Sequence, residues 1–165
     1  MATTHLGDTP VQTAGDLPVV GAAAPAFALT RSDLSPVSLE DFAGKRVILN
    51  IFPSIDTAVC AMSVRTFNTE AAALENAVVV CASADLPFAL SRFCGAEGIE
   101  NVITASTFRS DSFGSDYGVK MIDGKLAGLM ARAVVVIDES GTVAHAELVP
   151  AIGQEPDYAA ALASL

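Results

Sequence analysis

Continuous or nearly continuous runs of hydrophobic residues mark three segments of the chain and predict strands, of which the first two are expected to be buried in a sheet. These segments are 46–52, 77–82 and 133–137. A fourth segment, 142–149, follows the turn sequence Glu139-Ser-Gly141, so the last two segments are expected to form a hairpin. Shorter apolar stretches predict two short edge strands at 26–30 and 37–39 and a brief strand at 102–104.

Between these strands, apolar residues recur at helical spacing. Residues at steps of three and four predict a first helix from Val59 to about Asn76. A second helix is expected over 86–96, with Asp85 as its N-cap and Pro87 in its first turn. A short helix near 108–117 and a C-terminal helix over 158–165 complete the pattern.

The order of these elements predicts an α/β domain with a thioredoxin-like fold. Strand, helix, strand, helix, a strand hairpin and a final helix give a parallel core with an antiparallel edge pair when crossovers are right-handed. The polar segment 1–16 has turn signals at Gly7-Asp8 and Gly15-Asp16, which favour an N-terminal β-hairpin extension. We find no repeat or linker, so a single domain over 1–165 is expected.

Composition and charge exclude several classes of protein. The chain is 52% hydrophobic, which excludes general disorder, yet no apolar run is long enough for a membrane helix. The formal net charge of −10, with only nine Lys and Arg, argues against nucleic acid and anionic membranes as partners. Because 1–15 has neither a basic start nor a continuous apolar segment, no secretory signal is indicated and a cytoplasmic location is expected.

Three cysteines, Cys60, Cys81 and Cys94, are the main candidates for chemistry. An odd count at wide spacing does not indicate a structural disulfide framework, and no C-x-x-C pair is present. With only His5 and His145 besides, no zinc site can be assembled, and neither metal nor cofactor is expected. Cys81 ends a run of valines, so it is interpreted as a small buried hydrophobic residue.

Cys60 lies where a buried strand gives way to a helix. The unpaired N–H groups and positive dipole end of a helix start favour the thiolate. Asp56 and the acidic chain oppose it, so a nearby cation is required. The residues alone leave four candidates open: Arg65, Arg92, Arg109 and Arg132.

The segment around Cys60 resembles the peroxiredoxin family. Pro53, Thr57 and Cys60 match its pattern P-x-x-x-T-x-x-C, and the string Pro-Ser-Ile-Asp-Thr-x-Val-Cys is similar to the thiol peroxidase subgroup with two cysteines in one chain. The similarity continues in the blocks at 83–89, 92–97, 131–138 and 155–158. Position 58 is Ala where many members carry Pro, and we expect this to affect helix entry modestly without loss of chemistry.

The resemblance implies a role for each matching residue. Cys60 would be the peroxidatic nucleophile, and Thr57 would hydrogen-bond the thiolate and the incoming peroxide. Arg132 would stabilise the thiolate and the charge developing on the O–O bond, while Pro53 would wall the pocket. Cys94 would resolve the Cys60 sulfenic acid by forming an intramolecular disulfide.

The same resemblance implies substrates and partners. Hydrogen peroxide and organic hydroperoxides would be reduced, thioredoxin would recycle the disulfide, and the protein would form a homodimer. Because Cys94 falls on a separate predicted helix, we expect local unwinding around both cysteines during turnover.

Two other functions stay open at this point. A redox sensor would use the same Cys60–Cys94 switch to signal to a partner protein, and would be oxidised without efficient recycling. A non-catalytic binding module with this fold would show no special reactivity at Cys60.

Overall fold

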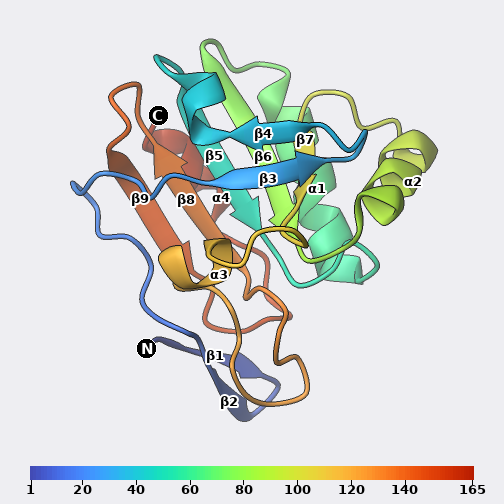
Figure 1. Cartoon of the computed structure of the whole chain (residues 1–165), viewed down its shortest axis with the longest axis vertical. Helices are drawn as coiled ribbons and strands as arrows, with labels where there is room; N and C mark the ends of the chain where they lie inside the picture. Colours follow the sequence, from blue (N-terminus) through green and yellow to red (C-terminus); the bar gives the residue numbers. More distant parts are fainter.

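One seven-stranded sheet forms the centre of the molecule (Figure 1). The computed structural model describes all residues from Met1 to Leu165. In chain order the strands are β3 (Ala28–Arg31), β4 (Pro36–Ser38), β5 (Arg46–Ile51), β6 (Ala77–Ser83), β7 (Ile103–Ser106), β8 (Ala133–Ile137) and β9 (Val143–Leu148). Their order across the sheet is β4-β3-β7-β6-β5-β8-β9, with β5, β6 and β7 parallel and all other pairs antiparallel. The predicted α/β, thioredoxin-like fold is confirmed.

Helices cover the two faces of the sheet unequally. One face packs against α1 (Ala58–Ala71), α2 (Pro87–Glu97) and α4 (Tyr158–Ala163). The other face is covered by the short α3 (Phe113–Asp116), the 3₁₀ turn η1 (Leu39–Phe42) and the chain around Phe27. Alternate residues of β5 and β6 enter each apolar layer, which explains why these strands are hydrophobic along nearly their whole length.

The antiparallel pairing of β5 and β8 places two loops at the same end of the sheet. Because β8 runs opposite to β5, Ala133 at the start of β8 pairs with Ile51 at the end of β5. The residue before β8 therefore lies beside the loop that joins β5 to α1. This register brings Arg132 to Cys60 although 72 positions separate them in the chain.

The N-terminal hairpin is also confirmed. It consists of β1 (Thr3–Leu6) and β2 (Thr9–Gln12) around Gly7-Asp8, and it forms a sheet of its own. In Figure 1 it lies below the main sheet, next to the chain that leads into β8. The backbone N–H of Ile152 donates to the carbonyl of His5 at 2.9 Å, which joins the hairpin to the loop after β9.

Several predicted boundaries are wrong. The first helix ends at Ala71 and not near Asn76, because single turns at Ala73 and Leu74 follow and Asn76 takes a left-handed backbone (φ 51°). The helix expected over 108–117 is limited to α3, since a turn occupies 107–110. The C-terminal helix stops at Ala163.

Two further predictions need correction. Of the two strands expected at an edge, only β4 lies there, because β3 pairs with both β4 and β7. Asp85 is not the N-cap of α2. That position is held by Leu86, which makes no side-chain capping bond, and the Asp85 carboxylate binds other groups.

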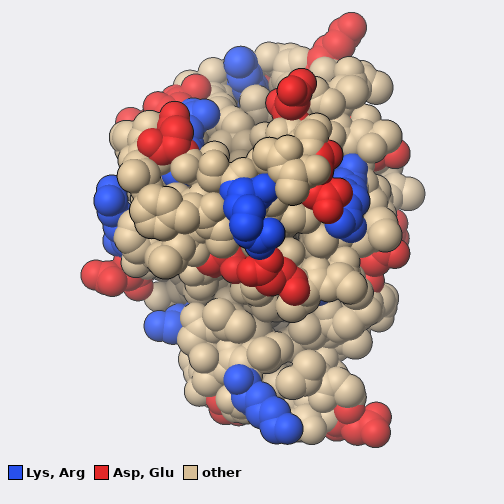
Figure 2. Space-filling view, turned by 90° about the vertical axis from the view of Figure 1, so that its right-hand side faces the viewer, with Lys and Arg blue, Asp and Glu red and all other residues tan.

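None of the helices combines the length and the apolar composition that a membrane span requires. Charged side chains of both signs are interspersed over the face drawn in Figure 2, and large uncharged areas separate them.

Candidate active site

Cys60 occupies the first turn of α1 and is fully buried. The first helical hydrogen bond runs from the N–H of Ala61 to the carbonyl of Thr57 at 3.0 Å. The N–H groups of the preceding residues have no helical acceptor, so partial positive charge collects around Cys60. Pro53 ends β5 without an N–H to donate, and the loop 53–57 then turns the chain into the helix.

Arg132 is the only one of the four candidate cations that contacts Cys60. Its Nη2 donates to the Cys60 sulfur at 3.3 Å, and its Nε donates to the carbonyl of Ile152 at 2.9 Å. Arg132 is only 2% exposed and forms no ion pair with a carboxylate. A buried guanidinium without a counter-ion is costly, and a thiolate at Cys60 is the anion within reach.

The other three arginines have partners elsewhere. Arg65 makes a two-bond pair with Glu97 and lies over the ring of Phe93, with its guanidinium carbon 5.6 Å from the centroid. This pair lowers the pKa of the Glu97 carboxyl. Arg92 pairs with Asp56 at 2.6 Å. Arg109 lies over the ring of Phe108 at 5.0 Å.

Thr57 occupies the N-cap position of α1 but makes no side-chain capping bond; its hydroxyl donates to the carbonyl of Ser54 at 2.9 Å. The sequence led us to expect a bond from Thr57 to the Cys60 sulfur, and this structure contains no such bond. Because a hydroxyl has one proton, Thr57 now presents only its oxygen lone pairs to other groups. It can therefore accept a hydrogen bond from a molecule that enters the site.

A pocket of about 320 Å³ opens beside these residues. Pro53, Thr57 and Arg132, the residues for which the resemblance implies contact with substrate, line it. Its remaining walls are mostly apolar and come from Leu6 of β1, the start of α1, the loop before β8 and the loop after β9: Ser54, Ala58, Val59, Leu126, Leu129, Ile152 and Gly153. A site with one buried cation and apolar walls suits a small polar group attached to an apolar body.

The sequence did not reveal Leu6, Leu126, Leu129 and Ile152 as pocket residues. They belong to segments far apart in the chain, and none lies in a motif. Ile152 has a second role that no pattern shows, since its backbone carbonyl anchors the guanidinium of Arg132.

The remaining two cysteines have different surroundings. Cys94, on α2, is partly buried, and its sulfur lies 3.5 Å from the Thr104 hydroxyl. All three cysteines are free thiols. Cys81 is fully buried, and burial raises the pKa of its thiol to about 12 despite a bond from the Asn50 amide at 3.6 Å. Its interpretation as a buried hydrophobic residue agrees with these surroundings.

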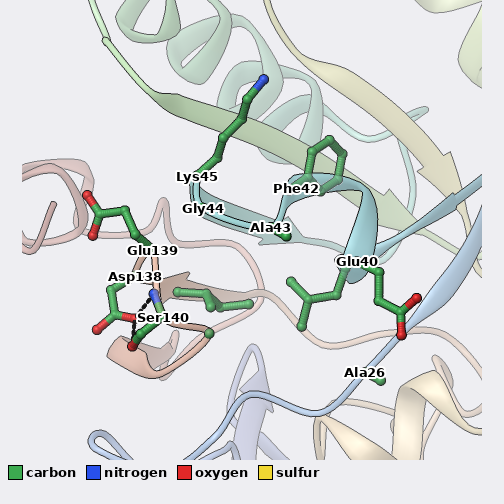
Figure 3. Close-up of a pocket in the computed structure, with 12 residues that line it drawn as sticks. Ala26, Glu40, Phe42, Ala43, Gly44, Lys45, Asp138, Glu139 and Ser140 are labelled. Carbon is green, nitrogen blue, oxygen red and sulfur yellow. Dashed lines mark hydrogen bonds between the residues drawn. The ribbon is translucent and has the colours of Figure 1, made fainter.

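A second pocket lies at the opposite end of β5, between η1 and the turn that joins β8 to β9 (Figure 3). Its volume is about 230 Å³. In Figure 3 the Lys45 side chain points away from it, while Ser140 bonds to Asp138. Arg132, which contacts the Cys60 sulfur, lines the first pocket and not this one, so the first pocket is the candidate for thiol chemistry.

Comparisons with known proteins show the family and the fold of the chain. Residues 19–162 match the Redoxin family. The chain is 61% identical to a thiol peroxidase of Mycobacterium bovis over 165 residues, which are all of this chain and 99% of the relative. A peroxiredoxin-like protein from Aquifex aeolicus is 37% identical with a TM-score of 0.93, covering 99% of this chain and 95% of that one. A thiol peroxidase from Chromobacterium violaceum, 23% identical, shares the fold with a TM-score of 0.89, covering 97% and 93%.

Proposed function

The chain belongs to the Redoxin family, as a thiol peroxidase of the peroxiredoxin type that reduces peroxides at the expense of thiols, and we propose that Cys60 is its peroxidatic cysteine and Cys94 its resolving cysteine. The observation that carries the proposal is the buried contact between Arg132 and the Cys60 sulfur. A guanidinium in this position stabilises an anionic sulfur, which is the reactive form of a cysteine.

The first step oxidises Cys60. Its thiolate attacks the terminal oxygen of a hydroperoxide, a sulfur–oxygen bond forms, and the O–O bond breaks. The electron pair of that bond leaves with the departing alkoxide or hydroxide, which takes up a proton, and Cys60 becomes a sulfenic acid. Arg132 is suited to stabilise the leaving oxygen, because its buried Nη1 has no hydrogen-bond partner. Thr57 is suited to accept the peroxide O–H.

The second step forms a disulfide. The Cys94 sulfur attacks the Cys60 sulfenic acid, the two sulfurs bond, and the oxygen leaves as water. In this structure Cys60 contacts Arg132 and Cys94 contacts Thr104, so each sulfur has to leave its present partner. We propose that the start of α1 and the end of α2 unwind locally to allow this.

The disulfide then needs a dithiol reductant, and thioredoxin is the proposed donor. Exchange with a dithiol restores Cys60 and Cys94 as free thiols, the state in which this structure holds them. Recycling of this kind fits a reducing compartment, and a cytoplasmic location is part of the proposal.

The pocket supports both small and organic hydroperoxides as substrates. Hydrogen peroxide needs only Cys60, Arg132 and Thr57, whereas the apolar walls offer contacts to the carbon skeleton of an organic hydroperoxide. Dimer formation is proposed from the surface: Leu86, Phe88 and Phe108 are 52%, 67% and 43% exposed, at the start of α2 and after β7. The segment after β7 is joined to the end of β6 by the bond from Thr107 N–H to the Ser83 carbonyl.

A coupled assay tests this function. Purified protein is mixed with thioredoxin, thioredoxin reductase and NADPH, and NADPH loss is followed after hydroperoxide is added. Cys60→Ser is expected to abolish turnover. Cys94→Ser is expected to permit one stoichiometric oxidation of Cys60 without recycling through the disulfide, and Cys81→Ser serves as the control with turnover retained.

Two outcomes of this assay contradict the proposal. If Cys60 is oxidised but thioredoxin does not recycle it, the protein is a redox sensor or uses another reductant. If mass spectrometry finds no oxidation of Cys60 after peroxide is added, the protein is not an active peroxidase.

A further inference from the structure

Asp85 makes an unusual set of hydrogen bonds between β6 and α2. Its carboxylate does not cap α2, although it lies two residues before that helix. One oxygen, Oδ1, accepts from the Ser54 hydroxyl at 2.8 Å. The other, Oδ2, accepts from the N–H of Ile55 at 2.7 Å and from the Ser83 hydroxyl at 2.6 Å. Two of its three donors therefore belong to the loop 53–57, which leads into α1 and Cys60.

Ser54 links Asp85 to Thr57 in the candidate site. Its carbonyl accepts from both the N–H of Thr57, at 3.2 Å, and the Thr57 hydroxyl, at 2.9 Å. Its hydroxyl oxygen also accepts from the N–H of Asp56 at 3.2 Å. The position of the Ser54 carbonyl thus sets the direction of the Thr57 hydroxyl. Asp85 holds this peptide group through the Ser54 hydroxyl and through the N–H of Ile55.

The direction of the Thr57 hydroxyl matters for the peroxide step. With its proton committed to Ser54, Thr57 offers lone pairs to the O–H of a bound hydroperoxide. In-line attack by the Cys60 sulfur requires that the peroxide be held within a fraction of an ångström. We propose that Asp85 is a positioning residue for this step: through Ser54 it holds Thr57 where it can orient the peroxide. The inference rests on the proposed role of Cys60.

The geometry calls for a carboxylate and not merely a side chain of this size. Three donors converge on the two oxygens of Asp85. Asparagine keeps the shape but has one acceptor oxygen and an NH₂ group that donates. In Asp85→Asn, either the Ser54 hydroxyl loses its acceptor or the N–H of Ile55 faces another donor. The loop must shift, while Arg132 and its contact to Cys60 are untouched.

The experiment compares two reactions of the same sulfur in the Cys94→Ser background. Oxidation by hydrogen peroxide requires an oriented peroxide, whereas alkylation by iodoacetamide requires the thiolate and access to it but no oriented peroxide. Both rates are measured by rapid quenching and mass spectrometry of the Cys60 peptide, with alkylation followed from pH 4 to 9. We expect Asp85→Asn to slow peroxide oxidation roughly 10- to 100-fold. The midpoint pH of the alkylation profile should be unchanged, and its plateau rate should remain within about twofold of the parent.

A matched control is available in Asp138→Asn. Asp138 also accepts three hydrogen bonds at a turn, from the N–H and hydroxyl of Ser140 and the N–H of Thr142, but it lies at the far end of the sheet. Both Cys60 reactions should be unchanged in this variant. If Asp85→Asn does not fold, Ser54→Ala removes one link of the same chain, and a several-fold loss confined to peroxide oxidation is expected.

Each failure has a separate meaning. If the Cys94→Ser parent is not oxidised at Cys60, the proposed function itself is wrong. If the parent reacts and Asp85→Asn reacts equally fast, only the positioning role is wrong. If oxidation and alkylation fall together in folded Asp85→Asn, or in Ser54→Ala where the first variant does not fold, the residue supports the site in general and does not orient the peroxide.

Discussion

Three cysteines of one chain show how strongly surroundings decide the chemistry of a single residue type. Cys60 contacts a buried guanidinium at a helix start, Cys94 lies partly buried beside a hydroxyl, and Cys81 is enclosed among apolar side chains. The thiol group is the same in each, but the stabilisation of its anion differs. Reactivity is expected only where a positive charge offsets burial.

Arg132 should therefore be essential to oxidation of Cys60. Arg132→Met keeps an apolar side chain of similar length but removes the donor to the sulfur and to the leaving oxygen. We expect the rate of Cys60 oxidation by hydrogen peroxide to fall about 100- to 1,000-fold, which is the usual loss for one such donor. Stopped reactions analysed by mass spectrometry measure this rate. Lys45→Met, which removes a cation at the other end of β5, should react like the parent, and an active Arg132→Met variant would exclude this role.

Cys81 provides the opposite prediction. Its pKa of about 12 lies above the ordinary value because burial disfavours the thiolate. Below that pH the neutral thiol predominates, so at pH 8 only about one molecule in ten thousand carries the anion. Cys60 is equally buried, but its sulfur contacts Arg132, which lines a pocket. Iodoacetamide at pH 8 should therefore label Cys60 and leave Cys81 unlabelled in the folded protein. Peptide mass spectrometry reads both sites, and labelling of Cys81 before denaturation would contradict its buried state.

Motif residues were the part of the site that the sequence could reveal. Pro53, Thr57 and Cys60 lie within eight positions. Pro53 and Thr57 line one pocket together with Arg132, which contacts the buried Cys60 sulfur. The direction of the Thr57 hydroxyl was not foreseeable, because its acceptor is a backbone carbonyl that could serve equally well in other loop conformations. The contacts of Asp85 were not predicted for a related reason. Its place before a helix indicated an N-cap, whereas the donors that it binds are brought to it only by the tertiary structure.

At the scale of elements, the N-terminal hairpin is part of the pocket. Leu6 of β1 forms one wall, and the hairpin is joined to the loop that supplies the Ile152 carbonyl to Arg132. Turn signals predicted the hairpin itself but could not place it, since a two-stranded ribbon carries little information about what it packs against. The same limit applies to β3, whose pairing with β7 follows from a contact between distant segments.

Shortening Leu6 should change the choice between substrates. Leu6→Ala removes apolar wall from the pocket and touches no group near the sulfur. We expect kcat/KM for cumene hydroperoxide to fall several-fold to about tenfold, while the value for hydrogen peroxide stays unchanged. The thioredoxin-coupled assay with each peroxide gives the ratio. Val20→Ala, at a surface position with 58% exposure, is the control, and equal losses for both substrates would show that Leu6 only supports the fold.

At the scale of the whole molecule, charge and apolar surface suggest where another copy could bind. The net charge of −10 opposes close association of two copies unless the contact is apolar. Leu86 and Phe88, before and within the first turn of α2, and Phe108, after β7, provide exposed apolar area on joined loops. These loops lie at the same edge of the sheet as the Cys60 pocket, because they follow the ends of strands parallel to β5.

This surface gives a prediction about assembly. If it joins two copies, Phe88→Glu places two carboxylates near the symmetry axis or against apolar side chains, and each arrangement costs binding free energy. Sedimentation velocity should show a dimer for the parent and at least about tenfold weaker association for Phe88→Glu. Val19→Glu adds the same charge at a site with 72% exposure and should leave the dimer intact.

Because Asp85 joins this surface to Ser54, a dimer contact here would also stiffen the loop that leads to Cys60. Peroxide oxidation should then slow on dilution below the dissociation constant, and a rate independent of concentration would separate assembly from catalysis.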